Sequence, residues 1–420
     1  MMANPAPVHT ALRVDRTLVV GLLLTFLASV GTGAVTLGIY FLTESALGYG
    51  RPRNYALALV MGLTYIIGAA GIGPTLSRHL TRIVSTRTVG LVLFLTIGAV
   101  STLPVLLAGS THAAPPAWTI WTVGAAFGVL TGSLWPIVEG YISGGRRDAN
   151  LRSAIGWFNI VWGTAVIVAM WLIAPYAQSA PMAVLLWVGA AHALAALLLL
   201  PLPKHPPRHL DDSPHQVNPR SVPLLRISRV LLPASYLLIS SLGPTIPAVL
   251  GMLHVDVTWK APAASTWLIA RLATFAFLEY WHGWHARWAP LLLGGAGLIV
   301  GFTAAVLSPR TGSLGLPMLF IGLTVFGVSA GLVYVASLYY GMEVGGSNVD
   351  DGGRHEAVIG LGYAGGPACG LLAVMLVGAD SDHLDLAVVS IVGPLAAGMI
   401  LFGLLMAGRI ARSARVPGGE

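Results

Sequence analysis

The chain has 420 residues, of which 55% are hydrophobic and only 9% are charged. A soluble globular protein carries roughly 25% charged residues, so this composition excludes a water-soluble protein and predicts one whose main solvent is lipid. A net charge of +7 is compatible with nucleic-acid binding. However, Lys and Arg lie in short segments between apolar runs, which excludes a nucleic-acid-binding protein.

Twelve apolar runs are long enough to span a membrane, because a hydrocarbon layer of about 30 Å needs about 20 helical residues. The first run follows Arg13 and Arg16 and is too long for a signal-peptide core, so we expect a retained helix. The single cysteine, Cys369, excludes an intrachain disulfide. The expected spans cover residues 17–43, 55–75, 86–108, 117–142, 153–176, 181–203, 229–252, 262–281, 289–307, 315–341, 356–378 and 386–408.

A segment rich in proline and charge separates the spans into two sets of six. It covers residues 204–228 and has too little apolar surface to fold alone, which predicts a linker. We therefore expect an N-terminal six-helix bundle over residues 1–203 and a C-terminal six-helix bundle over residues 229–420.

The basic residues predict the orientation of the chain. If the N-terminus is inside, the cytoplasmic segments hold 18 of the 23 Lys and Arg residues. Four lie on the outer side (Arg51, Arg53, Lys260 and Arg310), and Arg271 lies within a span. This imbalance predicts a multi-pass protein of the plasma (inner) membrane with both termini in the cytoplasm.

Two stretches, one in each half, follow the same plan. From Gly128 the chain reads GVLTGSLWP, and from Gly327 it reads GVSAGLVYV, so that Trp135 matches Tyr334. The glycines of each stretch allow another helix to approach closely. A repeat of this kind in apolar sequence predicts two similar membrane halves.

Two sets of six spans, joined by a basic loop and carrying an internal repeat, resemble the major facilitator superfamily. The segment GPTLSRHLTR, residues 73–82, is similar to that family's signature between helices two and three, although Ser77 replaces its acidic residue. The resemblance implies an all-α membrane fold of two pseudo-symmetric six-helix bundles. It also implies a gating role for Arg78 and Arg82, and a central site exposed alternately to each side.

Arg271 lies near the middle of the eighth span. Inserting a cation at that depth costs roughly 2.5–3.5 kcal/mol, so its side chain should face protein or a water-filled cavity. One interpretation is that the guanidinium binds an anionic solute through two hydrogen bonds. The other is a structural Arg that helix carbonyls or a neighbouring carboxylate satisfy.

Polar and aromatic residues inside the spans are candidates to line a substrate cavity, although each also suits a packed core. Trp135 continues the glycine stripe of the fourth span, and Asn159 and Tyr363 occupy matching positions in the repeat. The candidates for a substrate site are Arg271, Trp135, Asn159, Tyr334, Tyr363 and Tyr40.

Charged residues near the cytoplasmic ends of the spans are candidates for gating or coupling. Glu139 lies on the same helical stripe as Trp135, and Arg152 and Glu356 begin the fifth and eleventh spans. The alternative is that these residues cap helix ends. The candidates are Glu139, Glu279, Arg152, Glu356, His355, Arg78 and Arg82.

The sequence contains no convincing P-loop, metal-ligand cluster or nucleophile motif, so we expect no enzyme activity, no cofactor and no metal site. We expect a secondary active or facilitative transporter that moves a small polar or anionic organic solute by alternating access, with proton coupling left open. Its expected partners are that solute and the lipid bilayer, with no nucleic acid, and the oligomeric state is open. The alternative is a non-transporting receptor or assembly protein built on a transporter fold.

Overall fold

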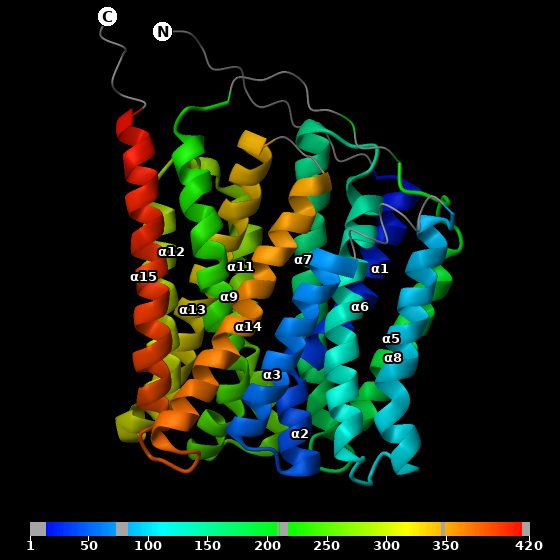
Figure 1. Ribbon diagram of the computed structural model, residues 1–420, viewed down its shortest axis with the longest axis vertical. Helices are drawn as coiled ribbons and strands as arrows, with labels where there is room; N and C mark the ends of the chain where they lie inside the picture. Colours follow the sequence, from blue (N-terminus) through cyan, green and yellow to red (C-terminus); the bar gives the residue numbers. More distant parts are fainter. Residues whose placement is uncertain (1–13, 73–82, 208–209, 211–216, 346–348, 414–420) are drawn as a thin grey trace, which may run out of the picture.

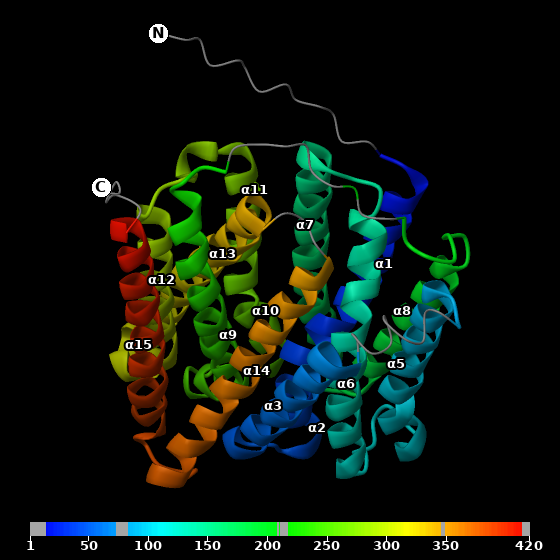
Figure 2. The same cartoon turned by 45° about the horizontal axis from the view of Figure 1, so that its top comes forward.

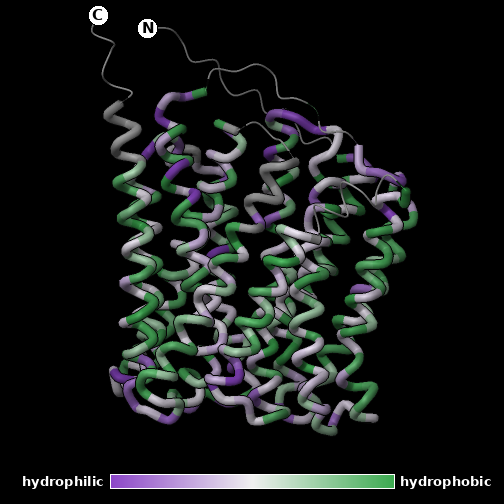
Figure 3. The backbone as a smooth tube through the Cα atoms, viewed as in Figure 1, coloured by the Kyte–Doolittle hydropathy of each residue, from purple (hydrophilic) through white to green (hydrophobic). Residues whose placement is uncertain are grey.

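The computed structural model describes residues 14–72, 83–207, 210, 217–345 and 349–413. Over these residues the chain forms helices that stand side by side in one bundle, joined by short connections (Figure 1). Figure 3 shows apolar residues along the middle of the helices and hydrophilic residues gathered at the two ends of the bundle. This banding is what a lipid bilayer requires.

Ten segments of the described chain are long and apolar enough to cross a membrane. One of them, Ala289–Val344, contains two helices, and Ala183–Leu199 is a further apolar helix that is somewhat shorter. Large apolar side chains face outward, such as Leu293 at 68% exposed and Met375 at 82% exposed. The chain is therefore a multi-pass membrane protein, and the count of twelve spans stays a prediction.

The first part of the chain forms the helices drawn from blue to green on the right of Figure 1. The first span contains a wider, π-helical turn between two α-helices, and the next helix ends in another such turn. The elements are α1 (Arg16–Thr32), η1 (Gly33–Leu37), α2 (Ile39–Leu47), α3 (Arg51–Ile66), η2 (Ile67–Ile72), α5 (Thr86–Ala108), α6 (Ala117–Ser143), α7 (Asp148–Ile173), η4 (Ala174–Tyr176) and α8 (Ala183–Leu199).

The start of α1 is fixed by one carboxylate. Asp15 accepts a hydrogen bond from the backbone N–H of Leu18 at 2.8 Å, which caps the helix. The same carboxylate lies 2.7 Å from Nη2 of Arg146, a buried residue between α6 and α7. This ion pair ties the beginning of the first span to the end of the fourth.

The second part of the chain forms the helices on the left of Figure 1. The expected eighth span consists of two helices, because the α-helix is interrupted at Ser265. The elements are α9 (Ser221–Met252), α10 (Val257–Ala264), α11 (Thr266–Tyr280), η5 (His282–Trp284), α12 (Ala289–Leu307), η6 (Ser308–Leu314), α13 (Gly315–Gly345), α14 (Val349–Val377) and α15 (Leu384–Ser413).

Helix α9 begins at Ser221, within the segment 204–228 that the sequence predicted to be linker. Leu224 and Ile227 are buried, whereas Arg226 is exposed, so this stretch is an amphipathic helix. Hydropathy alone does not predict this helix, because its exposed face is charged. The predicted linker therefore extends too far, since residues 221–228 are helical.

The repeated glycines make the same kind of contact in both halves. A Cβ on Gly132 of α6 would lie 2.7 Å from the carbonyl oxygen of Tyr65 on α3. A Cβ on Gly331 of α13 would lie 2.8 Å from Cβ of Thr274 on α11. Since either glycine could be enlarged only by moving a neighbouring helix, α6 packs on α3 as α13 packs on α11. This equivalence is the pseudo-symmetry that the repeat predicted.

The two halves meet mainly along α3 with α14 and along α7 with α11. Figures 1 and 2 both show α14 lying beside α3 between the two groups of helices. Helix α1 begins and α15 ends at the same end of the bundle, at the top of Figure 1. We call this the terminal end and the opposite one the distal end.

Candidate functional site

A cavity lies between the two halves and holds about 940 Å³ of empty space, its mouth included. Its lining comes from both halves: Thr32, Thr36, Leu37, Tyr40, Ala58, Met61, Gly62, Tyr65, Gly128, Thr131, Trp135, Glu139, Phe158 and Trp162 from the first, and Tyr236, Ile239, Ser240, Gly243, Tyr334, Glu356, Ile359 and Tyr363 from the second.

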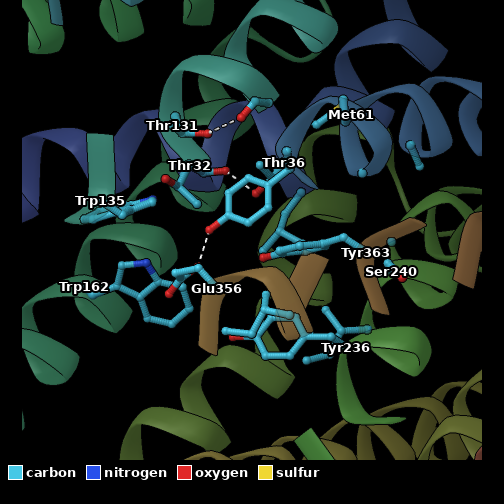
Figure 4. Close-up of a pocket in the computed structure, with 18 of the residues that line it drawn as sticks. Thr32, Thr36, Met61, Thr131, Trp135, Trp162, Tyr236, Ser240, Glu356 and Tyr363 are labelled. Atoms are coloured by element: carbon cyan, nitrogen blue, oxygen red, sulfur yellow. Dashed lines mark hydrogen bonds between the residues drawn. The ribbon is translucent and has the colours of Figure 1, made fainter. Parts of the chain in front are cut away.

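Aromatic rings form much of the cavity wall, and Figure 4 shows Trp135, Trp162, Tyr236 and Tyr363 around one space. The ring of Tyr363 packs edge-to-face against Tyr236, with centroids 5.1 Å apart. Trp135 packs edge-to-face against Phe158 at 6.0 Å. Such contacts fix the orientation of the rings, so the wall is preorganised to contact a ligand.

Two carboxylates line the cavity, Glu139 from α6 and Glu356 from α14. The hydroxyl of Tyr65 on α3 donates a hydrogen bond to the Glu356 carboxylate across the boundary between the halves (Figure 4). Among the side chains that the structure describes, no basic group forms an ion pair with either carboxylate. Carboxyl groups inside a membrane protein are costly, and they commonly mark a functional site.

Arg271 borders the cavity but is not part of its lining. Its side chain is only 2% exposed, and its guanidinium carbon lies 4.7 Å from the ring centroid of Tyr334 and 5.0 Å from that of Trp162. Phe275 contributes a third ring at 5.2 Å. The cation is therefore held by aromatic faces, an arrangement that neither interpretation of the sequence foresaw.

The polar contacts of Arg271 are few. One Nη atom lies 3.5 Å from the Tyr236 hydroxyl, and Nε has no hydrogen-bond partner within the described residues. Asn159, on α7, is also buried beside the cavity wall, and its Oδ1 likewise lacks a partner in that part of the chain. Both residues lie behind the surface that a ligand would touch.

The structure thus gathers six of the thirteen predicted substrate and coupling residues in one cavity. Trp135, Glu139, Tyr334, Tyr363, Tyr40 and Glu356 line it.

Two further gating candidates lie toward the terminal end. Arg152 and Glu279 are exposed, and the Glu279 carboxylate lies against α7, because a Cβ on Gly156 would be 3.1 Å from its Oε2. Glu279 therefore joins α11 of one half to α7 of the other. Arg78, Arg82 and the side chain of His355 lie outside the described residues.

Several residues that line the cavity were not predicted from the sequence. Tyr236, Ser240 and Gly243 recur on one face of α9, and Thr32 and Thr36 precede Tyr40 at intervals of four residues. Polar or small residues at helical spacing within an apolar span are the signal that identifies such a face.

Two ion pairs join the halves at the distal end. Arg51 at the start of α3 pairs with Asp385 at the start of α15, and the exposed fractions of the two side chains are 15% and 6%. Lys260 Nζ on α10 lies 2.9 Å from Glu44 Oε1 on α2. We call these four residues the distal rim.

Further hydrogen bonds between the halves reinforce the distal rim. The amide of Gln178 donates to the Asp256 carboxylate at 3.3 Å, and the Tyr55 and Thr245 hydroxyls lie 2.6 Å apart in a buried hydrogen bond. Asp256 also accepts from the backbone N–H of Thr258, which holds the pKa of this carboxyl below its usual range. The halves are thus closely joined at the distal end.

No protein-family model matches the sequence, and no curated protein matches it. Solved structures do. The nucleoside transporter NupG aligns with a TM-score of 0.65 at 14% identity, over 93% of this chain and 99% of that one. A mutant of NupG gives 0.62 at 15% identity, over 94% of this chain and 100% of that one.

A bacterial homologue of the human lysosomal transporter Spinster, inward-facing and unoccupied, aligns with a TM-score of 0.58 at 15% identity. The alignment covers 94% of this chain and 95% of that one. Identities this low show the fold alone. The chain therefore has the fold that its sequence predicted, the twin-bundle fold of the major facilitator transporters.

Proposed function

We propose that the protein is a transporter that moves a small organic solute across the membrane by alternating access. The observation that carries this proposal is the cavity between the halves. It lies inside a multi-pass membrane protein, both halves contribute to its wall, and its lining includes carboxylates and hydroxyls that a lipid-facing core would exclude.

The contacts between the halves support a conformer that is closed at the distal end. Arg51 with Asp385 and Lys260 with Glu44 bridge the halves there. Rocking of one half against the other would break these pairs and open the cavity to the distal side. The close contacts of α3 with α14 and of α7 with α11 would serve as the sliding surfaces.

We assign the terminal end to the cytoplasm, because 18 of the 23 Lys and Arg residues belong to the segments expected there. Glu139 and Glu356 are the residues we propose for proton coupling, if transport is coupled to protons. Arg152, Glu279, His355, Arg78 and Arg82 remain proposed gating residues. Arg271 and Asn159 would act on the solute through the wall that they support.

Labelling from both sides of the membrane tests alternating access. Cys369 is replaced by Ala, Thr36→Cys supplies a thiol in the cavity wall, and the protein is reconstituted in one orientation. A membrane-impermeant maleimide should label this cysteine from either side. Leu293→Cys, on the lipid-facing surface, is the control and should stay unlabelled from both sides.

Labelling of Thr36→Cys from a single side under all conditions would contradict the proposal. That outcome would favour the alternative, a receptor or assembly protein that holds one conformation.

A further inference from the structure

We propose that the solute is an organic cation, an amine or quaternary ammonium compound with an apolar or aromatic body. This inference rests on the proposed transport function and names the substrate class of the same cavity. It departs from the anionic solute that the position of Arg271 in the sequence suggested.

The first argument is the sign of the charges that a solute would meet. Within the described side chains, the cavity lining contains two acidic side chains, Glu139 and Glu356, and no basic one. They come from opposite halves, so a cation between them would contact both. An anion in the same place would face two carboxylates without a basic partner in the wall.

The second argument is the surface between the carboxylates. Aromatic rings line the cavity from both halves, among them Trp135 and Trp162 from the first and Tyr363 from the second. The face of an aromatic ring carries partial negative charge and attracts cations, and quaternary ammonium groups are recognised by cages of such rings. Rings and carboxylates together would replace the water that a cation loses on entering the membrane.

The third argument is the position of Arg271, the residue that would favour an anion. Its guanidinium contacts the rings of Trp162, Tyr236 and Tyr334, all of which line the cavity, while Arg271 itself does not. The rings therefore separate the guanidinium from the cavity. An anion could reach the guanidinium only by displacing them.

Glu356 is the better positioned of the two carboxylates. Its hydrogen bond from the Tyr65 hydroxyl fixes the carboxylate relative to α3 of the other half. A solute bound to Glu356 therefore interacts with both halves at once. Such a contact would couple solute binding to the relative position of the two halves.

The test compares three probes of similar size that differ in charge: benzyltrimethylammonium, benzyl alcohol and phenylacetate. Each is added to the purified full-length protein, and binding is measured as an increase in unfolding temperature. The cation should bind at least about tenfold more tightly than either other probe, because carboxylates and ring faces both favour it.

Variants locate the binding site. Glu356→Gln and Glu139→Gln should each weaken binding of benzyltrimethylammonium by about tenfold, as expected when a charge-assisted contact is lost. Glu343→Gln, on the same helix as Tyr334 but outside the cavity lining, should leave that affinity unchanged. The probe comparison uses the unaltered protein, so a variant that fails to fold does not weaken the test.

The cation proposal is overturned if benzyltrimethylammonium binds no more tightly than phenylacetate or benzyl alcohol, or if both glutamine variants retain full affinity. The transport proposal fails separately, through one-sided labelling of Thr36→Cys. A third outcome is uptake of uridine into proteoliposomes that benzyltrimethylammonium does not inhibit. It would contradict the cation proposal and support the transport proposal.

Discussion

The carboxylates of the distal rim and those of the cavity have different surroundings. At the rim, Asp385 is held by Arg51 and Glu44 by Lys260, each pair joining the two halves. In the cavity, no described basic side chain forms an ion pair with Glu139 or Glu356.

This difference separates two tasks. Paired charges at the rim stabilise one arrangement of the halves. Because each charge is neutralised by its partner, the pair attracts a charged ligand only weakly. Carboxylates without such a partner remain available to a solute or a proton. Rim variants should therefore change the balance between conformations, and cavity variants should change binding.

The largest expected effect comes from reversing a cavity charge. Glu356→Lys would place an ammonium group in the cavity wall where the cationic solute is proposed to bind, and like charges in such a setting cost several kcal/mol. We expect uptake of benzyltrimethylammonium into proteoliposomes to fall by about 100-fold or more. Asp385→Lys, a reversal of the same kind at the rim, should reduce uptake far less, and equal losses would contradict the division of tasks.

A charge swap at the rim should have an intermediate effect. Arg51→Asp places two carboxylates together and should favour the conformer open at the distal end. Adding Asp385→Arg should restore the closed conformer, with an interaction energy of about 1–3 kcal/mol. The measurement is the rate at which Thr36→Cys is labelled from the distal side in each single variant and in the double variant. If the free-energy changes calculated from these rates were strictly additive, the pair would not hold the halves together.

Lys260→Gln should have the smallest effect. The Glu44 side chain is 30% exposed, against 6% for Asp385, so water screens this pair more strongly. We expect a change below about 1 kcal/mol in the same labelling assay. Arg53→Ala is the matched control, because the contact of Arg53 with the Tyr49 ring at 5.3 Å stays within one half. A larger effect from Arg53 than from Lys260 would contradict the assignment of the rim.

Much of the fold could be predicted from the sequence, because hydropathy and loop charge report directly on the bilayer. The helix Thr86–Ala108 occupies the span predicted for it, and the glycines of the repeat pack as expected. The start of α9 was missed because Arg226 interrupts an apolar run whose buried face still forms a helix.

The cavity was only partly predictable. Trp135 and Tyr334 stood out because the repeat aligns them, and both line the cavity. The surroundings of Arg271 could not be read from the chain, because the rings that cover it come from three other helices as well as its own. Tertiary packing decides whether a buried charged side chain lines a cavity or lies behind its lining. The hydropathy of the sequence does not report this packing.

Distances measured by double electron–electron resonance test the central claim most directly. In a Cys369→Ala background, spin labels at Arg53 and Ser313 span the halves at the distal end, and labels at Ile83 and Arg287 span them at the terminal end. All four positions are exposed. On adding Arg51→Gln, we predict that the distal distance lengthens while the terminal distance shortens. Two distances that stay fixed, or that change in the same direction, would contradict alternating access controlled by the rim.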